Sequence, residues 1–272
     1  MGQLSDLRTF PYNVCMQTTL TDKKVIAFDL DGTLARSKQS LEPHISKLLC
    51  DLLRNKKIIV ISGGSYSQYE NQFLSSLSCD LITYENLFLM PASGSQLYLY
   101  KNGKWEKEPV DDLSPELKTK IKEAFLYALK EVNFDLTASS YGERFQDRGT
   151  QFSFSALGEN APLNEKAPWD PDQKKRREIA SILLPLLPEC TIKIGGTTTI
   201  DVTHGGVDKA TALEKMSKYL QIDLKDFLFV GDALYEGGND NVVKRLGIET
   251  IQVDNDNGQT TVDTEKVLQQ LV

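Results

Sequence analysis

Two aspartates stand one residue apart at the point where an apolar run of the chain ends. The stretch AFDLDGTLARS (27–37) places Asp29 and Asp31 directly after this run, with Gly-Thr behind them. Carboxylates this close repel each other, and the pKa of one of them is usually raised. A bound cation, or a proton kept on one carboxyl for transfer, would make such a pair tolerable. These two residues are therefore the first candidates for a catalytic site.

Further polar residues follow other apolar runs of the chain or begin a predicted helix. They are Ser62 and Gly63 after 57–61, Asp232 with Asn239 and Asp240 after 226–231, and Lys209 at a helix start. In open α/β sheets, ligands bind at the carboxyl ends of the strands. We therefore expect these side chains to share one edge of a sheet with Asp29 and Asp31.

Acidic groups that converge on one edge predict a hard divalent cation with oxygen ligands. Mg²⁺ commonly binds through one or two carboxylates together with phosphate oxygens and water. Ser62, Lys209 and the glycine-rich backbone near Gly63 would then hold a phosphate group. The sequence thus predicts Mg²⁺ as cofactor and a phosphate ester as ligand.

Alternating strand and helix patterns predict the elements that position these residues. Strands are expected over 23–30, 57–64, 226–233 and 248–253, and the helix over 41–55 repeats apolar residues at helical spacing. Such alternation is typical of a parallel sheet covered by helices. The fold class predicted is therefore α/β, with a Rossmann-like parallel-sheet core.

The pattern changes near residue 95. The segment 96–105 contains Asn-Gly at a hairpin position, 115–132 is an amphipathic helix, and 148–157 and 191–203 alternate like antiparallel strands. Helices mixed with such strands predict an α+β insertion. We expect a catalytic core formed by 1–95 and 205–272, and an inserted cap over 96–204 that contains Trp105 and Trp169 as packing residues.

Composition limits the classes of binding partner and the cellular compartments that are compatible with the sequence. The 272 residues carry a formal net charge of -7, and no basic stripe is present, which argues against nucleic acid as a partner. Neither a signal-peptide pattern nor an apolar run long enough for a membrane span is found.

The spacings of Cys15, Cys50, Cys79 and Cys190 match no zinc or redox pattern, and Cys50 and Cys190 are expected in or near the core. A cytoplasmic protein is expected.

Four ordered motifs resemble those of the haloacid dehalogenase superfamily of phosphotransferases. They are DLDGTLARSK, ISGGS, the lysine of GGVDK, and GDALYEGGND, and the resemblance spans roughly 25–260. GGTTTIDVTHGGVDK and the long loop of the last motif are similar to eukaryotic-type phosphomannomutases, which have the cap type called IIB. The resemblance implies a haloacid dehalogenase-like core, an inserted cap and a small sugar phosphate as substrate. Members often pair through their caps, so a homodimer is a further expectation.

The resemblance implies specific roles in the core. Asp29 would be the nucleophile that takes the phosphoryl group as an aspartyl phosphate, and Asp31 the general acid and base. Asp29, the backbone carbonyl of Asp31, and Asp232 would coordinate Mg²⁺, with Asn239 and Asp240 close by. Ser62 and Lys209 would stabilise charge on the transferring oxygens.

The cap positions match the family unevenly. Arg148 matches the first family arginine that binds substrate phosphate, whereas the other two fall at Glu159 and Lys166. Lysine can still act as a point charge, but glutamate cannot hold a phosphate. Thr199 and Asp201 match a hydroxyl and a carboxylate that contact the sugar.

Simpler interpretations stay open for single features. Asp-x-Asp-Gly alone could be a turn, Gly195-Gly196 a tight turn only, and Lys209, Arg148 and Lys166 solvated side chains. The KKRR run (174–177) is most often a solvated helix face, and neither His44 nor His204 is assigned a role.

Three functions are compatible with the sequence. The first is a mutase that moves phosphate between two positions of a hexose phosphate, interconverting mannose 1-phosphate and mannose 6-phosphate. The second is a sugar-phosphate phosphatase, which the missing cap arginines favour. The third is a binding module without activity, against which the joint presence of Asp29, Asp31, Lys209 and Asp232 argues.

Overall fold

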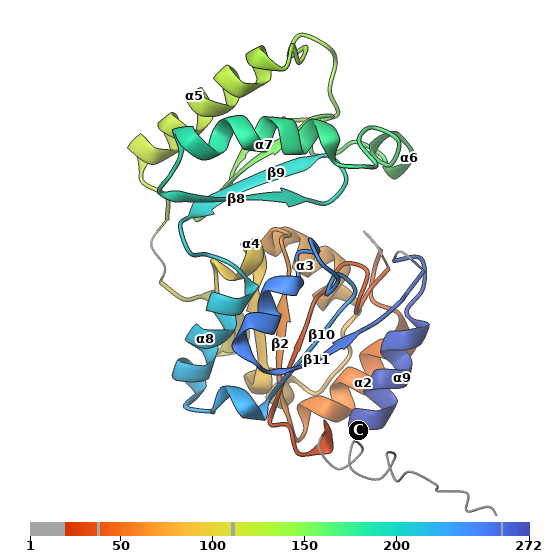
Figure 1. Ribbon diagram of the computed structural model, residues 1–272. Helices are drawn as coiled ribbons and strands as arrows, with labels where there is room; N and C mark the ends of the chain where they lie inside the picture. The colour runs from red at the N-terminus through yellow and green to blue at the C-terminus, as the bar shows by residue number, and fades with distance from the viewer. Residues whose placement is uncertain (1–19, 37–38, 110–111, 257) are drawn as a thin grey trace, which may run out of the picture.

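The computed structural model of the chain describes residues 20–36, 39–109, 112–256 and 258–272, and these form two sheets with their own helices (Figure 1). The larger sheet has the strand order β11-β10-β1-β2-β3-β4-β5, and the smaller has the order β6-β7-β9-β8. The smaller sheet comes from the middle of the chain, between β5 and α8, and lies at one end of the larger sheet.

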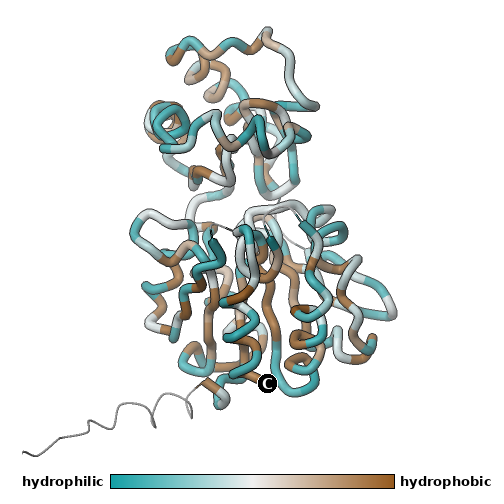
Figure 2. The backbone as a smooth tube through the Cα atoms, turned by 90° about the vertical axis from the view of Figure 1, so that its right-hand side faces the viewer, coloured by the Kyte–Doolittle hydropathy of each residue, from teal (hydrophilic) through white to brown (hydrophobic). Residues whose placement is uncertain are grey.

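The predicted parallel core is confirmed. Its parallel strands are β1 (Val25–Phe28), β2 (Lys57–Ile61), β3 (Leu87–Met90), β10 (Phe227–Gly231) and β11 (Glu249–Gln252). Figure 2 shows hydrophobic residues along the central strands, and every residue of β1, β3 and β10 is buried, as expected for a sheet that is covered on both faces. The helices of this part are α2 (Pro43–Leu53), α3 (Tyr66–Gln72), α4 (Pro91–Gly94), α8 (Lys209–Leu220) and α9 (Val262–Leu271), with 3-10 turns at Leu74–Ser76, Leu81–Asn86, Leu224–Asp226 and Asn241–Leu246.

Alternate residues of each central strand pack on opposite faces of the large sheet. Ile26 and Phe28 of β1 pack with residues of α2 and α9, whereas Val25 and Ala27 pack with Leu213 of α8. This alternation follows from the two-residue period of a strand. The sheet therefore holds the ends of β1, β2 and β10 in one rigid edge between two hydrophobic layers.

The expected boundary of the cap at residue 96 is wrong for the hairpin that follows it. Strands β4 (Tyr98–Lys101) and β5 (Lys104–Lys107) extend the large sheet, because β4 pairs antiparallel with β3. Trp105 accordingly packs on Tyr84 and Tyr100, with ring centroids at 5.8 and 5.3 Å, and not in the smaller sheet. An antiparallel edge on a mostly parallel sheet is common in such folds.

The smaller sheet has one apolar and one polar face. Its antiparallel strands are β6 (Phe145–Asp147), β7 (Gln151–Ser155), β8 (Cys190–Gly195) and β9 (Thr199–His204), and its helices are α5 (Pro115–Glu131), α6 (Leu163–Lys166) and α7 (Lys174–Leu186). Phe154 and Ile200 pack against Phe125 of α5 and Leu183 of α7. In Figure 1, α5 and α7 lie beyond this sheet, so its other face is turned toward the large sheet.

Two of the cysteines form a disulfide bond that the sequence analysis did not anticipate. Cys50 of α2 is bonded to Cys79 with a sulfur–sulfur distance of 2.05 Å, whereas Cys190 is free. Such bonds persist mainly in oxidising compartments. The cytoplasmic location therefore stays a prediction, and this bond does not favour it.

A search of the described helices finds none that combines the length and the apolar character needed to cross a membrane.

Candidate active site

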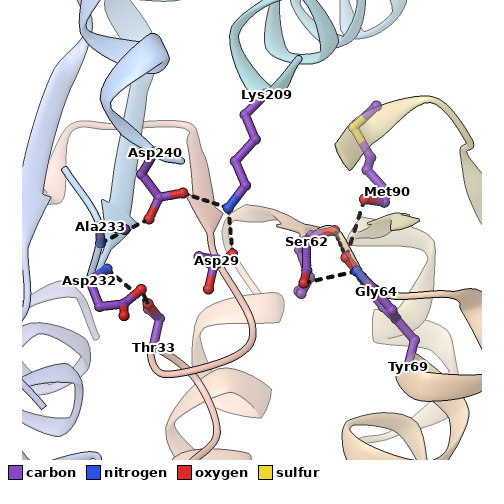
Figure 3. A network of polar contacts seen from close by, with 11 residues as sticks. Asp29, Thr33, Ser62, Gly64, Tyr69, Met90, Lys209, Asp232, Ala233 and Asp240 are labelled. Atoms are coloured by element: carbon purple, nitrogen blue, oxygen red, sulfur yellow. Dashed lines mark hydrogen bonds and ion pairs between the residues drawn. The ribbon is translucent and has the colours of Figure 1, made fainter. Parts of the chain in front are cut away.

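The carboxyl ends of β1, β2 and β10 bring the predicted catalytic side chains together (Figure 3). Asp29 follows β1, and its backbone N–H donates to the carbonyl of Val230 in β10 at 3.0 Å. This bond continues the pairing of the two strands and fixes the backbone of Asp29 at the sheet edge. Only 3% of Asp29 is exposed, so its carboxylate is largely removed from water.

Lys209 joins two of the predicted carboxylates. Its ammonium nitrogen lies 2.5 Å from Oδ1 of Asp29 and 2.5 Å from Oδ1 of Asp240. Lys209 is the first residue of α8, where Asp208 caps the helix by accepting from the backbone N–H of Thr211 at 2.9 Å. This N-cap interaction of Asp208 fixes the first turn of α8, and so directs the side chain of Lys209 toward the edge of the large sheet.

Asp232 is held by the loop that follows the first aspartates. The hydroxyl of Thr33 donates to Oδ1 of Asp232 at 3.3 Å and accepts from the backbone N–H of Asp232 at 3.1 Å. Gly32 has φ +93, and a Cβ atom on it would lie 2.8 Å from Oδ2 of Asp232. Both the turn and the close approach therefore require glycine at this position.

The acidic cluster fits a divalent cation. Asp29, Asp232 and Asp240 each offer a carboxylate oxygen, and these oxygens lie within 4.8 Å of one another. Lys209 is the ammonium that pairs with this cluster, so three ionised carboxylates leave two negative charges uncompensated. Carboxylate oxygens are ligands that Mg²⁺ prefers.

The pKa values show the same excess of negative charge. Burial, together with Asp240 and Asp232, raises the pKa of Asp29 to about 8, although Lys209 opposes the shift. Burial and Asp240 also raise the pKa of Asp232. Burial alone would lower the pKa of Lys209, but Asp240 and Asp29 outweigh it and the net shift is upward. Lys209 therefore stays charged while the carboxylates resist losing their protons.

Asp31 lies outside this acidic cluster. Its Oδ1 accepts a hydrogen bond from the side-chain amide of Gln72 in α3 at 3.1 Å. The same amide donates to the backbone carbonyl of Arg36 at 3.3 Å, so it ties Asp31 to the loop that follows β1. Gln72 was not predicted from the sequence, because nothing in its neighbourhood marks it as a partner of Asp31. Asn239 is exposed on the loop that leads to Asp240, and its role near a metal stays a prediction.

Ser62 and Gly63 lie beside a segment in an unusual backbone conformation. Ala92, Ser93 and Gly94 have φ values of 52, 57 and 85°, so three consecutive residues are left-handed. Such conformations are costly for residues other than glycine and concentrate at functional sites. The N–H of Ser93 donates to the carbonyl of Ser62 at 2.8 Å, which couples this turn to the predicted phosphate-binding loop. Ser93 was not among the residues predicted from the sequence.

The polar face of the smaller sheet contains the predicted sugar-binding residues. Oδ1 of Asp201 accepts from the hydroxyl of Ser153 at 2.6 Å, and the hydroxyl oxygens of Thr199 and Ser155 lie 3.3 Å apart. Oδ2 of Asp201 lies 4.0 Å from where a Cβ atom on Gly63 would be. The small sheet therefore faces the loop after β2 at close range.

The predicted phosphate-binding cations of the cap have other partners. Arg148 donates a hydrogen bond to the side-chain oxygen of Gln146. The ammonium of Lys166 donates to the backbone carbonyl of Glu159 at 2.9 Å, and the side chain of Glu159 is exposed. The structure thus brings Lys166 and Glu159 together. Substrate binding by Arg148 and by Lys166 stays a prediction.

The KKRR run is only partly a solvated face, because Arg176 is buried and 2% exposed. Its Nε donates to Oδ2 of Asp170 at 2.8 Å, and one terminal nitrogen donates to the carbonyls of Gly195 and Gly196 at 3.1 and 2.7 Å. Arg176 therefore fixes the turn between β8 and β9. That turn positions Thr199 and Asp201.

Comparison with known proteins places the chain in a family. A model of haloacid dehalogenase-like hydrolases matches residues 26–241. The phosphomannomutase of Encephalitozoon cuniculi (strain GB-M1) is 25% identical over 226 residues, 80% of this chain and 83% of that protein. The phosphomannomutase of Spinacia oleracea is 27% identical over 223 residues, 79% of this chain and 84% of that protein.

A solved structure supports the fold independently. N-terminally truncated IMP-nucleotidase of Plasmodium falciparum superposes with a TM-score of 0.71 at 17% identity, covering 96% of this chain and 73% of that one. At this identity the likeness concerns the fold alone. Together with the family match and the acidic site at the strand ends, it leads to one assignment. The chain belongs to the haloacid dehalogenase-like hydrolases, as an enzyme of their phosphotransferase or phosphatase type.

Proposed function

We propose that the enzyme transfers the phosphoryl group of a hexose phosphate, in a Mg²⁺-dependent reaction through an aspartyl phosphate on Asp29. The reaction proposed is phosphomannomutase-like, the interconversion of mannose 1-phosphate and mannose 6-phosphate. The observation that carries the proposal is the buried contact of Lys209 with both Asp29 and Asp240 at 2.5 Å. The phosphomannomutases that cover about four-fifths of the chain support the choice of substrate.

The proposed chemistry begins at Asp29. A carboxylate oxygen of Asp29 attacks phosphorus, the bond from phosphorus to the sugar oxygen breaks, and that oxygen takes a proton from Asp31. Lys209 and Ser62 hold the non-bridging phosphoryl oxygens, and Gly63 lets the backbone approach them. A bound Mg²⁺ would be held by Asp29, Asp232 and the backbone carbonyl of Asp31, with Asp240 and Asn239 near it, and would neutralise phosphoryl charge. The hydrogen bond from the side-chain amide of Gln72 to Asp31 at 3.1 Å orients this proposed general acid.

The second half of the reaction returns the phosphoryl group to the sugar. The other hydroxyl of the hexose attacks phosphorus, Asp31 accepts its proton, and the carboxylate of Asp29 is restored. The small sheet must grip the sugar while this happens and must keep water away from the phosphoenzyme. We propose that the segment between β5 and α8 performs this task, with Arg148, Thr199, Asp201 and Lys166 as contacts.

A phosphatase is the second candidate function, and one observation favours it. Glu159, at a position where the family has an arginine, is exposed and carries the wrong charge for a phosphate. Water would then take the phosphoryl group from Asp29. A tenfold change in the relative rate of attack by water corresponds to only about 1.4 kcal/mol, so a small change in the cap is sufficient.

Phosphorus NMR with mannose 1-phosphate and Mg²⁺, with and without a hexose bisphosphate, tests both functions. Conversion to mannose 6-phosphate supports the mutase, and release of inorganic phosphate supports the phosphatase. If no phosphate ester of a broad panel reacts, both proposals are wrong. Light scattering of the same sample checks the further proposal that two copies pair through the small sheet and its helices.

A further inference from the structure

The polar face of the small sheet carries one row of paired residues that crosses all four strands. Gln146 of β6 pairs with Ser153 of β7, Ser153 with Asp201 of β9, and Asp201 with Lys193 of β8. Directly paired residues point to the same face of a sheet. Lys193 therefore lies on the same face as Asp201, which is the face turned toward the large sheet and its candidate catalytic loops.

Lys193 is a half-buried cation with no carboxylate in ion-pair contact among the residues that the structure describes. Its two acidic neighbours bind other groups. Asp208 accepts from Arg245 at 2.7 and 2.9 Å, and Asp201 accepts from Ser153 at 2.6 Å. Removing an ammonium from water without a counter-charge is costly. An anion supplied from outside the chain would offset that cost.

The electrostatic surroundings of Lys193 agree with its position. Burial, together with repulsion from Lys209 and Arg245, lowers its pKa to about 8, against the attraction of Asp208 and Asp201. Repulsion from Lys209 means that Lys193 lies within electrostatic range of the catalytic lysine. Lys209 begins α8 of the core, and Lys193 lies on the face of the small sheet that is turned toward the large sheet.

A second and independent observation on this face points to a ligand. Gln151 is 0% exposed, and its side-chain nitrogen donates to Ser153 at 3.0 Å, but its Oε1 has no hydrogen-bond partner within the described structure. The side-chain nitrogen of Gln146 is also buried and unpaired there. Buried polar atoms of native proteins are nearly always satisfied. Unpaired atoms beside the row indicate a polar ligand that the face is built to receive.

We propose that, when a hexose bisphosphate occupies the site, Lys193 binds the phosphate that is not being transferred, and so selects phosphate esters that carry a second phosphate. This proposal deepens the proposed function and rests on it. Lys209 contacts two carboxylates at the ends of the core strands, whereas Lys193 comes from the small sheet and has no carboxylate in ion-pair contact within the described part of the chain. Lys193 would then supply the positive charge that Glu159 cannot provide.

The test compares kcat/KM for two substrates, one that carries two phosphates and one that carries a single phosphate. In Lys193→Met, the ratio of kcat/KM for a hexose 1,6-bisphosphate to that for p-nitrophenyl phosphate should fall roughly 10- to 100-fold, mainly through a higher KM for the bisphosphate. Lys193→Arg should restore most of the ratio, because it keeps the charge. Lys122→Met removes an exposed lysine of α5 and should leave the ratio unchanged. An unchanged ratio in Lys193→Met, or an equal loss for both substrates, would overturn the proposal.

A binding measurement separates this inference from the proposed function. Calorimetry with the hexose 1,6-bisphosphate and Mg²⁺ in Asp29→Asn measures affinity without turnover. Adding Lys193→Met should weaken binding by the same roughly 10- to 100-fold. If the wild-type enzyme turns over no phosphate ester, the proposed function fails while this binding result still decides the role of Lys193. Equal affinity in the two variants rules that role out.

Discussion

Lys209 and Asp240 form an ion pair that water hardly reaches, because their side chains are 2% and 0% exposed. Asp240 also accepts the backbone N–H of Ala233 at 3.2 Å, so it links Lys209 to the loop that carries Asp232. The pair is therefore both a structural link between α8 and the loop after β10 and the means by which Lys209 is aimed at Asp29.

Lys209→Met should abolish activity and also destabilise the protein. It leaves the buried carboxylates of Asp29 and Asp240 without their cation, a change that typically costs about 3–5 kcal/mol. Thermal unfolding in the absence of divalent metal checks the stability, with Lys215→Met as a control that removes another lysine of the same helix. A melting temperature equal to that of the wild type would contradict the arrangement described.

Asp29→Asn should abolish activity without destabilising the fold. The amide keeps the volume but removes one charge from a cluster that has too many, so the metal-free variant should be at least as stable as the wild type. Single-turnover assays and a melting curve check both statements. Residual turnover above a few per cent of wild type would rule out Asp29 as the nucleophile.

Mg²⁺ should stabilise the protein more at pH 8 than at pH 6. The pKa of Asp29 is raised from its ordinary 3.8 to about 8, so between these values the metal-free folded state holds a proton that the unfolded state has lost. Unfolding then releases a proton, and the contribution of this group to stability falls as the pH rises through that window. A bound cation offsets the repulsion between the ionised carboxylates.

Melting temperatures with Mg²⁺ and with excess chelator, measured at both pH values, check this prediction. Excess chelator should also stop catalysis. Activity that persists in chelator would mean that the acidic cluster does not act through a metal.

Arg176→Met should destabilise the smaller sheet. It leaves Asp170, which is 2% exposed, as an uncompensated buried charge and frees the carbonyls of Gly195 and Gly196. The expected loss is about 3–5 kcal/mol, with weaker substrate binding because the turn before Thr199 loosens. Arg177→Met, at the exposed neighbour in the same helix, is the matched control. Similar unfolding curves for the two variants would show that the buried network contributes little.

Replacing Cys50 and Cys79 together by serine should lower the stability by about 3 kcal/mol, because the bond closes a loop between residues 29 apart in sequence. Cys190→Ser is the control, since that thiol is free. Denaturant unfolding gives the comparison, and mass measurement after alkylation shows whether the thiols are bonded. Three alkylated cysteines among positions 50, 79 and 190 of the purified wild type would contradict the disulfide.

The sequence was sufficient for the parallel core and for the side chains at its edge. Asp29, Ser62 and Asp232 each follow an apolar strand, and parallel strands end at one edge, so their proximity follows from local pattern alone. The Asn-Gly turn correctly predicted the hairpin of β4 and β5, but not that β4 would pair with β3 of the large sheet. Whether β4 joins one sheet or the other depends on contacts with Phe88 and Leu89, far from any local signal.

Residues of the smaller sheet were harder to predict. Arg176 belongs to a run of charges, and its burial depends on Asp170 and on two glycine carbonyls 19 and 20 positions away. Lys193 and Gln151 share a face with Asp201 only through the register of antiparallel strands. A shift of one residue in that register would place them on the opposite face, so no reading of single segments could have identified them.

The insertion of the smaller sheet between β5 and α8 also bears on how the enzyme comes to be active during synthesis. Lys209 is 180 positions from Asp29 in the sequence, and Asp232 is 199 positions from Thr33. Strand β1 is the first part of the large sheet to leave the ribosome. It cannot pair with β10 until the whole insertion has followed it. Contacts of such separation form slowly and late. We therefore expect a nascent chain to complete its smaller sheet first, and to assemble the candidate catalytic site only after the chain has been made as far as Asp240.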